Sequence, residues 1–195
     1  MTESNLRRYL IICWRPASLI LLAGILLFLT FNRHSRSGIQ TYHSEIWGDK
    51  AGYYVYLPAA FLYSFDAARF PQEIDSLTGN GFQLDREDHR VLTKYTCGVA
   101  VMMTPFFLTT HAIASLFNAL NDGFSAPYHR MIDVAAIFYL MAGFLLWYHV
   151  LRRYFTQTVA ILTIATLFLG TGLYYYAIDE ILGCKSKFLV ISSGN

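Results

Sequence analysis

One loop of this chain gathers residue types that could carry out acid–base chemistry. It contains the carboxylate of Asp49, followed closely by the aromatic row Tyr53, Tyr54 and Tyr56. A carboxylate can act as a general base toward a hydroxyl or can bind a divalent metal. A solvated aspartate that caps a following helix is the simpler alternative for Asp49. The residue types leave both roles open.

A second candidate lies just before a long apolar stretch, where Lys94 and Tyr95 are adjacent. A lysine ammonium at that depth can hold a lipid phosphate, because pairing between two charged groups strengthens the hydrogen bond. Lysines at helix ends also extend to the membrane interface without any specific ligand. His43 and Glu45 precede Asp49, but their spacing matches no strong metal-binding pattern.

Ionisable residues inside the apolar stretches have structural explanations. Arg130 and Asp133 lie three residues apart, which predicts an ion pair on one helix face. His111 lies among apolar residues, and we expect it to form a hydrogen bond with a neighbouring helix.

The composition indicates a membrane protein. The chain has 195 residues, of which 55% are hydrophobic and 14% charged, whereas about 25% charged residues is usual for soluble domains. A net charge of +2 and the absence of a basic stripe argue against nucleic-acid binding. Cys13, Cys97 and Cys184 form neither a CxxC pair nor a metal-ligand spacing, and their odd number argues against a disulfide framework.

Four stretches are apolar enough to cross a bilayer, which takes about 20 residues. Because backbone polar groups inside a bilayer must pair internally, we predict an all-α integral membrane protein with four transmembrane helices. The predicted segments are a basic cytoplasmic tail (1–15), helices at 16–31, 98–120, 131–150 and 158–178, an extracytoplasmic loop (32–97) and an atypical tail (179–195).

The long loop itself is predicted to contain interfacial helices. Tyr54, Leu57, Phe61 and Phe65 recur at spacings of three and four, which is the period of one helix face. A helix with such a face beside a membrane span would lie at the interface. Pro58 disfavours the interior of a helix but is tolerated near its start.

The distribution of basic residues gives no decisive orientation. The arginines of the 1–15 tail favour a cytoplasmic N-terminus by the positive-inside rule. With four spans, however, Arg152 and Arg153 fall outside, which the same rule disfavours.

Together these features resemble the N-terminal part of a GT-C type membrane glycosyltransferase. That superfamily includes the protein O-mannosyltransferases and the aminoarabinose transferases of lipid A. The likeness covers residues 10–180 and rests on the order of the spans and on short motifs. The motifs are Gly48-Asp49, Tyr53-Tyr54-Val55-Tyr56-Leu57-Pro58-Ala59, Lys94-Tyr95 and Arg152-Arg153-Tyr154-Phe155.

The resemblance implies transfer of a sugar from a polyprenyl-phosphate carrier to an extracytoplasmic acceptor. Asp49 would be the catalytic base or a metal ligand, with a divalent metal left open as a cofactor. Lys94 would contact the carrier phosphate, and tyrosine rings would stack on the sugar. The implied substrate-binding residues are Lys94, Tyr53, Tyr54, Tyr56 and Tyr95.

The resemblance also implies a multi-pass protein of the cell (inner) membrane, with membrane lipid and a polyprenyl-phosphate-linked sugar as partners and no nucleic acid. GT-C enzymes have more spans, and the residues after Asp179-Glu180 depart from their pattern. We therefore expect an incomplete N-terminal fragment that needs a missing C-terminal half or a partner subunit. The alternative is a non-catalytic four-helix scaffold or assembly partner. A transporter fragment is disfavoured, because the polar residues gather in one loop instead of at the bilayer midplane.

Overall fold

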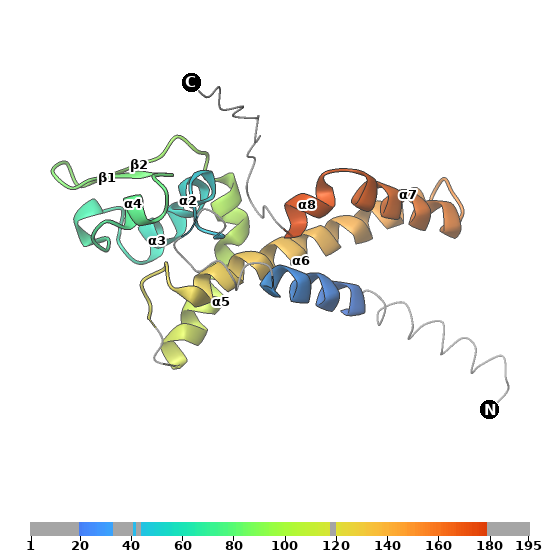
Figure 1. The fold of residues 1–195 in the computed structure, drawn as a ribbon, viewed down its shortest axis with the longest axis horizontal. Coiled ribbons are helices and arrows are strands. Elements are labelled where there is room, and N and C mark those ends of the chain that lie inside the picture. Colours follow the sequence, from blue (N-terminus) through green and yellow to red (C-terminus); the bar gives the residue numbers. More distant parts are fainter. Residues whose placement is uncertain (1–19, 33–40, 42–43, 118–119, 179–195) are drawn as a thin grey trace, which may run out of the picture.

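A computed structural model describes residues 20–32, 41, 44–117 and 120–178 of the chain, and this part is mostly helical (Figure 1). After the helix Ile20–Asn32, the elements are α2 (Asp49–Tyr54), α3 (Tyr56–Phe61), the 3-10 helix η1 (Ala67–Arg69), α4 (Ile74–Leu77), β1 (Gln83–Asp85), β2 (Arg90–Leu92), α5 (Gly98–Leu116), α6 (Ala126–Leu151), α7 (Gln157–Gly170) and α8 (Leu173–Ile178).

Two helices, α5 and α6, are long and apolar enough to cross a membrane, while Ile20–Asn32 and α7 are apolar but shorter. The helix expected over 131–150 starts earlier, at Ala126. The stretch expected to form one helix over 158–178 is interrupted instead. There α7 ends at Gly170, and Thr171 adopts an extended backbone before α8 begins.

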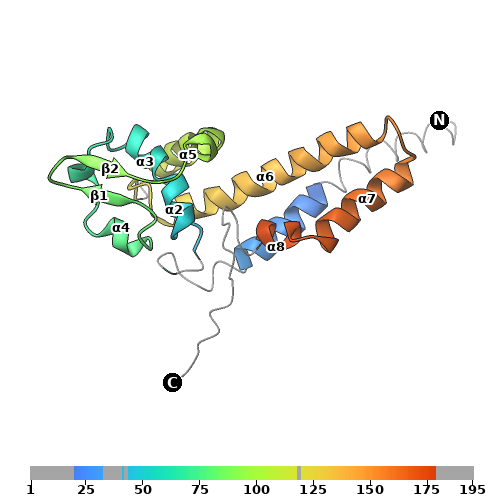
Figure 2. The same ribbon diagram turned by 90° about the horizontal axis from the view of Figure 1, so that it is seen from above.

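Three of the helices form an elongated bundle. Ile20–Asn32, α6 and α7 lie side by side in both views (Figures 1 and 2). Their shared core consists of Leu26, Ile137, Met141, Phe144 and Phe168. Large apolar side chains also point outward from this bundle, including Phe28 and Leu146, each 70% exposed. Such outward-facing apolar residues suit a lipid environment.

Apart from α8, which packs on α6 and α7, the rest of the described chain packs around α5 at one end of the bundle (Figure 1). Helices α2 and α3 bury one face against α5, with Tyr54, Leu57 and Phe107 in the shared core. Strands β1 and β2 pair antiparallel, with Leu84 opposite Val91. The sequence reading did not foresee this hairpin in the polar part of the loop.

The helix period found in the loop produces two short helices. Helices α2 and α3 meet at Val55, and Pro58 lies in the first turn of α3, where a missing N–H costs little. Tyr54 and Leu57 are buried, whereas Phe61 and Phe65 are about half exposed. The chain turns at Gly79, which has a φ of +77°.

Both structural explanations for ionisable residues in apolar stretches are confirmed. The Arg130 Nη1 and Asp133 Oδ2 atoms lie 3.8 Å apart. The His111 Nδ1 atom lies 2.7 Å from the hydroxyl of Tyr128 on α6. These side chains therefore have local partners within the described fold.

Candidate functional site

The candidate site joins the start of α2 to the residues that follow β2. Asp49 is the first residue of α2, and the Tyr95 hydroxyl donates a hydrogen bond to its Oδ1 atom. Two further bonds hold the backbone around Tyr95 in place. The Thr93 hydroxyl donates to the carbonyl of Gly52 at 3.0 Å, and the Tyr56 hydroxyl donates to the carbonyl of Tyr95 at 2.6 Å.

Glycines allow this close approach of chain segments. A Cβ atom on Gly52 would lie 2.1 Å from the Tyr95 ring, and one on Gly81 would lie 1.7 Å from the carbonyl oxygen of Gly48. The Gly48 N–H donates to the carbonyl of Thr78 at 2.7 Å. The turn around Gly81 therefore packs against the start of α2, next to Asp49.

Lys94 adds a cation to the cluster. Its Nζ atom lies 5.2 Å from the centroid of the Tyr95 ring, within the range of a cation–π interaction. The side chain is exposed, and within the described part of the chain it forms no ion pair. Its ammonium is therefore accessible to an anion that approaches the Asp49 side of the loop.

Tyr53, Tyr54 and Tyr56 differ in their burial and contacts. The Tyr53 ring is partly exposed and lies 4.5 Å from the Tyr95 ring, centroid to centroid. Tyr56 is partly buried and supports Tyr95 through its hydroxyl. Tyr54, however, is fully buried, and its hydroxyl donates to the carbonyl of Gly123 at 2.5 Å. Tyr54 thus belongs to the core, while the other predicted site residues gather around Tyr95.

The surroundings of Tyr95 keep its hydroxyl protonated. Burial, together with the hydrogen bond to Asp49 and its negative charge, raises the pKa of Tyr95 above its ordinary value of 10.0. Its hydroxyl therefore stays protonated near neutral pH and continues to donate to Asp49. The Asp49 carboxylate has a second oxygen, which is available to accept a proton.

A protein-held metal centre is not formed by the described residues. No group of three or more His, Cys, Asp or Glu side chains among them could hold a metal ion. Glu45 instead lies with its Oε2 atom 2.8 Å from Nδ1 of the buried His129, and His43 falls outside the described residues. No catalytic step is therefore assigned to a metal.

The sequence reading missed a buried polar cluster beneath the loop. Glu45 and His129 form its centre, and the buried Lys50 donates from Nζ to the carbonyl of Ser44 at 3.3 Å. The fully buried carboxyl group of Asp133 lies one helical turn after His129. Glu45 and Lys50 flank Asp49 in the sequence, but nothing in their spacing pointed to α6.

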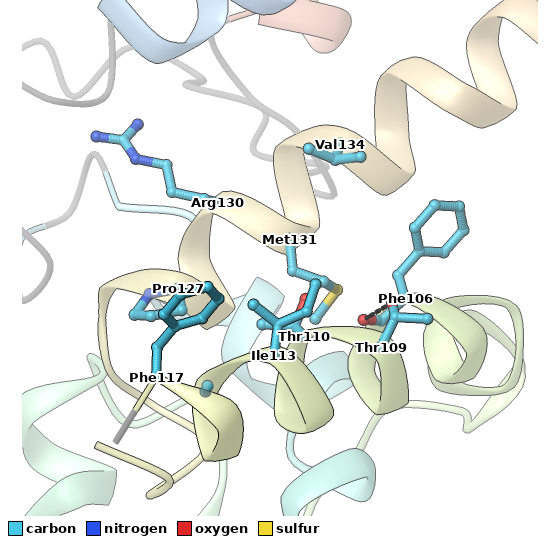
Figure 3. A pocket seen from close by; sticks show the side chains of 10 residues that line it. Phe106, Thr109, Thr110, Ile113, Phe117, Pro127, Arg130, Met131 and Val134 are labelled. Carbon is cyan, nitrogen blue, oxygen red and sulfur yellow. Dashed lines mark hydrogen bonds between the residues drawn. The ribbon is translucent and has the colours of Figure 1, made fainter. Parts of the chain in front are cut away.

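A cavity lies elsewhere, between α5 and α6 (Figure 3). It has a volume of about 510 Å³ and is lined mainly by apolar side chains, among them Phe106, Ile113 and Val134. Arg130 also borders it, but the Arg130 side chain extends away from the groove (Figure 3), and its guanidinium lies 5.2 Å from the ring of Phe31. The groove is therefore an apolar feature that is separate from the Asp49 cluster.

No family model, no curated protein and no solved structure matches this chain.

Proposed function

We propose that this chain is the N-terminal portion of a GT-C-like membrane glycosyltransferase, which transfers a sugar from a polyprenyl-phosphate carrier to an extracytoplasmic acceptor. The observation that carries the proposal is the convergence of Asp49, Tyr95 and Lys94 at one end of the loop. A general base, a group that orients it and a cation for a phosphate are the parts that such a transfer needs.

In this reaction the bond between the sugar and the carrier phosphate breaks, and a bond from the sugar to the acceptor oxygen forms. Asp49 accepts the proton of the acceptor hydroxyl on the oxygen opposite the one that Tyr95 holds. Lys94 stabilises the negative charge on the departing polyprenyl phosphate. The partly exposed ring of Tyr53 offers a face for the sugar.

The proposal places the protein in the cell (inner) membrane as a multi-pass protein, with the Asp49 cluster on the outer side. Helices α2 and α3 then lie at the interface, where a lipid-linked substrate presents its phosphate. The exposed Lys94 and the tyrosine rings beside it suit headgroup depth.

Binding of polyprenyl phosphate to the purified chain in lipid nanodiscs tests the proposal. Lys94→Gln should weaken binding about tenfold, since a hydrogen bond to a charged group is worth about 1.5–3 kcal/mol. Arg90→Gln, which removes an exposed hairpin cation paired with Asp88, is the matched control and should leave binding unchanged.

Asp49→Asn separates binding from chemistry. It should retain carrier binding but abolish sugar transfer in membranes that contain the whole transfer system, because an amide cannot accept the acceptor proton. If the wild-type chain bound no polyprenyl phosphate, or if Lys94→Gln and Arg90→Gln behaved alike, the proposal would fail and the non-catalytic scaffold would be the better description.

A further inference from the structure

Tyrosines of one short loop segment hold the backbone before and after α5, at Tyr95 and at Asp122–Gly123. Before α5, the Tyr56 hydroxyl donates to the carbonyl of Tyr95 at 2.6 Å. After α5, the Tyr54 hydroxyl donates to the carbonyl of Gly123 at 2.5 Å. The nearby Tyr63 hydroxyl adds a bond to the carbonyl of Asp122 at 2.7 Å.

These hydrogen bonds limit the distance between the backbone before α5 and the backbone after it. Tyr54 and Tyr56 are two residues apart, so with both side chains extended in opposite directions the two carbonyl oxygens lie at most about 25 Å apart. The hydrocarbon core of a bilayer is about 30 Å thick. The backbone on either side of α5 therefore cannot lie in the polar layers of opposite membrane faces.

The charges of the same segment lead to the same conclusion. Helices α2 and α3 pack along α5, so a membrane-spanning α5 would draw them into the hydrocarbon. That segment carries Asp49 and Lys50, and ionisable side chains are costly to place in hydrocarbon. With the loop outside the hydrocarbon, this cost disappears.

The two faces of α5 suit a position at the membrane surface. Ala100, Met103 and Phe107 are buried against the loop and α6. The exposed face carries the large apolar side chains of Val101, Met102, Leu108, Ile113 and Leu116, which are 44–79% exposed, together with Thr109 and Ser115. The groove between α5 and α6 adds apolar surface that includes Ile113 (Figure 3). In Figure 1 α5 crosses the first part of α6 obliquely, away from the three-helix bundle.

We infer that α5 lies in the surface of the outer leaflet, with its exposed face on the acyl chains, and that the described chain crosses the membrane three times. The crossings are centred on Ile20–Asn32, on α6, and on α7 with α8. Although α5 meets the length and composition of a span, the hydrogen bonds keep Tyr95 before it and Gly123 after it on the loop side. The inference does not depend on glycosyl transfer.

Three crossings, unlike four, agree with the positive-inside rule at both clusters of basic residues. With three crossings, Arg152 and Arg153 after α6 fall on the same side as the basic 1–15 tail. The positive-inside rule then places both clusters in the cytoplasm. Asp122 and the polar turn around it remain outside, beside the loop residues that bind them.

Cysteine accessibility distinguishes three crossings from four. The starting point is a chain in which Cys13, Cys97 and Cys184 are replaced by serine. Single cysteines are then introduced as Asn121→Cys, in the turn between α5 and α6, and as Tyr154→Cys, in the turn between α6 and α7. Both positions are exposed, and Tyr154→Cys leaves Arg152 and Arg153 intact. A chain that retains only the exposed Cys97 serves as the reference for the loop side.

With a membrane-impermeant maleimide on intact spheroplasts, Asn121→Cys should label as Cys97 does, whereas Tyr154→Cys should label only after permeabilisation. Four crossings give the opposite pattern, with Tyr154→Cys labelled and Asn121→Cys protected, and that result would overturn the inference.

Depth measurements check the orientation of α5 independently. Spin labels at Val101→Cys, Leu108→Cys and Leu116→Cys in liposomes should show similar, shallow depths from their collisions with oxygen and a water-soluble relaxer. If α5 crossed the membrane, the label at Leu108 would lie about 10 Å deeper than those at the ends. A depth profile of that kind would refute the surface position.

Discussion

The hydroxyl of Tyr95 donates a hydrogen bond to a carboxylate oxygen of Asp49, although 46 positions separate the two residues in the chain. The bond connects the start of α2 with the segment that leads from β2 into α5. It occupies one carboxylate oxygen and leaves the other for a substrate. The orientation of the proposed base is therefore set by the segment that also carries Lys94.

Removing the Tyr95 hydroxyl should impair transfer without impairing carrier binding. Tyr95→Phe keeps the ring under Lys94 but deprives Asp49 of its donor, a bond worth about 1.5–3 kcal/mol because the acceptor is charged. We expect kcat to fall at least about tenfold, with the Kd for polyprenyl phosphate unchanged. Sugar transfer in membranes and binding in nanodiscs measure the two quantities.

Tyr139→Phe is the matched control for this variant. It removes a tyrosine hydroxyl bonded to the carbonyl of Met102 at 2.6 Å, away from Asp49. An equal loss of transfer in both variants would show that the Tyr95 hydroxyl acts only through stability.

A side chain at position 52 should disrupt the site. The Cβ atom of Gly52→Ala would meet the Tyr95 ring at 2.1 Å and the carbonyl oxygen of Gly81 at 2.4 Å. Relieving such overlap costs about 1–3 kcal/mol and displaces Tyr95 from Asp49. We expect a lower unfolding midpoint in detergent, followed by circular dichroism, and weaker carrier binding.

Gly143→Ala provides the comparison, because nothing lies within 4 Å of a Cβ atom at that position in α6. Alanine is favoured over glycine within helices by up to about 1 kcal/mol, so this variant should be as stable as the wild type or more stable. If the two variants had the same unfolding midpoint, the close packing at Gly52 would be refuted.

Features that depend on neighbours in the sequence were predictable. The ion pair of Arg130 and Asp133 follows from a spacing of three on one helix. The buried face of α2 and α3 follows from the period that includes Tyr54 and Leu57. The sequence analysis placed that face at the membrane interface and grouped Tyr54 with Tyr53 and Tyr56 as a substrate residue, whereas Tyr54 is buried in the core.

Features that depend on distant segments were not predictable. Glu45 and His129 are 84 positions apart, and only the packing of the loop on α6 brings them together. Asp49 meets Tyr95 because the hairpin returns the chain to α2, and the sequence reading expected no hairpin. The composition of α5 fits a span, but the hydroxyls that bond the backbone before and after it belong to other helices.

Loss of the Tyr54 hydroxyl should loosen the turn after α5. Tyr54→Phe leaves the buried carbonyl of Gly123 without its donor, which costs about 1–3 kcal/mol. We expect a lower unfolding midpoint and faster hydrogen exchange in the peptide that contains Gly123. Tyr53→Phe removes the hydroxyl of the preceding, partly exposed tyrosine. It should change neither the unfolding midpoint nor the rate of hydrogen exchange. Equal exchange in wild type and Tyr54→Phe would show that the bond does not hold the turn.

High pH should destabilise the attachment of the loop through Tyr63. Burial, with the negative charge of Asp122 adding to it, raises the pKa of Tyr63 from 10.0 to about 12. The folded state thus favours the neutral phenol, which donates to the carbonyl of Asp122 at 2.7 Å. Its contribution to stability is fully present below pH 10 and is lost as the pH rises through about 12.

Unfolding midpoints measured in detergent from pH 8 to 12 test this linkage. Tyr63→Phe should be less stable than wild type at pH 8, because it lacks the hydrogen bond, but the difference should shrink between pH 10 and 12. Tyr154→Phe, at a position that is 77% exposed, should follow the wild-type curve throughout. Parallel curves for wild type and Tyr63→Phe would mean that ionisation of Tyr63 is not coupled to folding, and that its bond to Asp122 does not secure the loop beside α5.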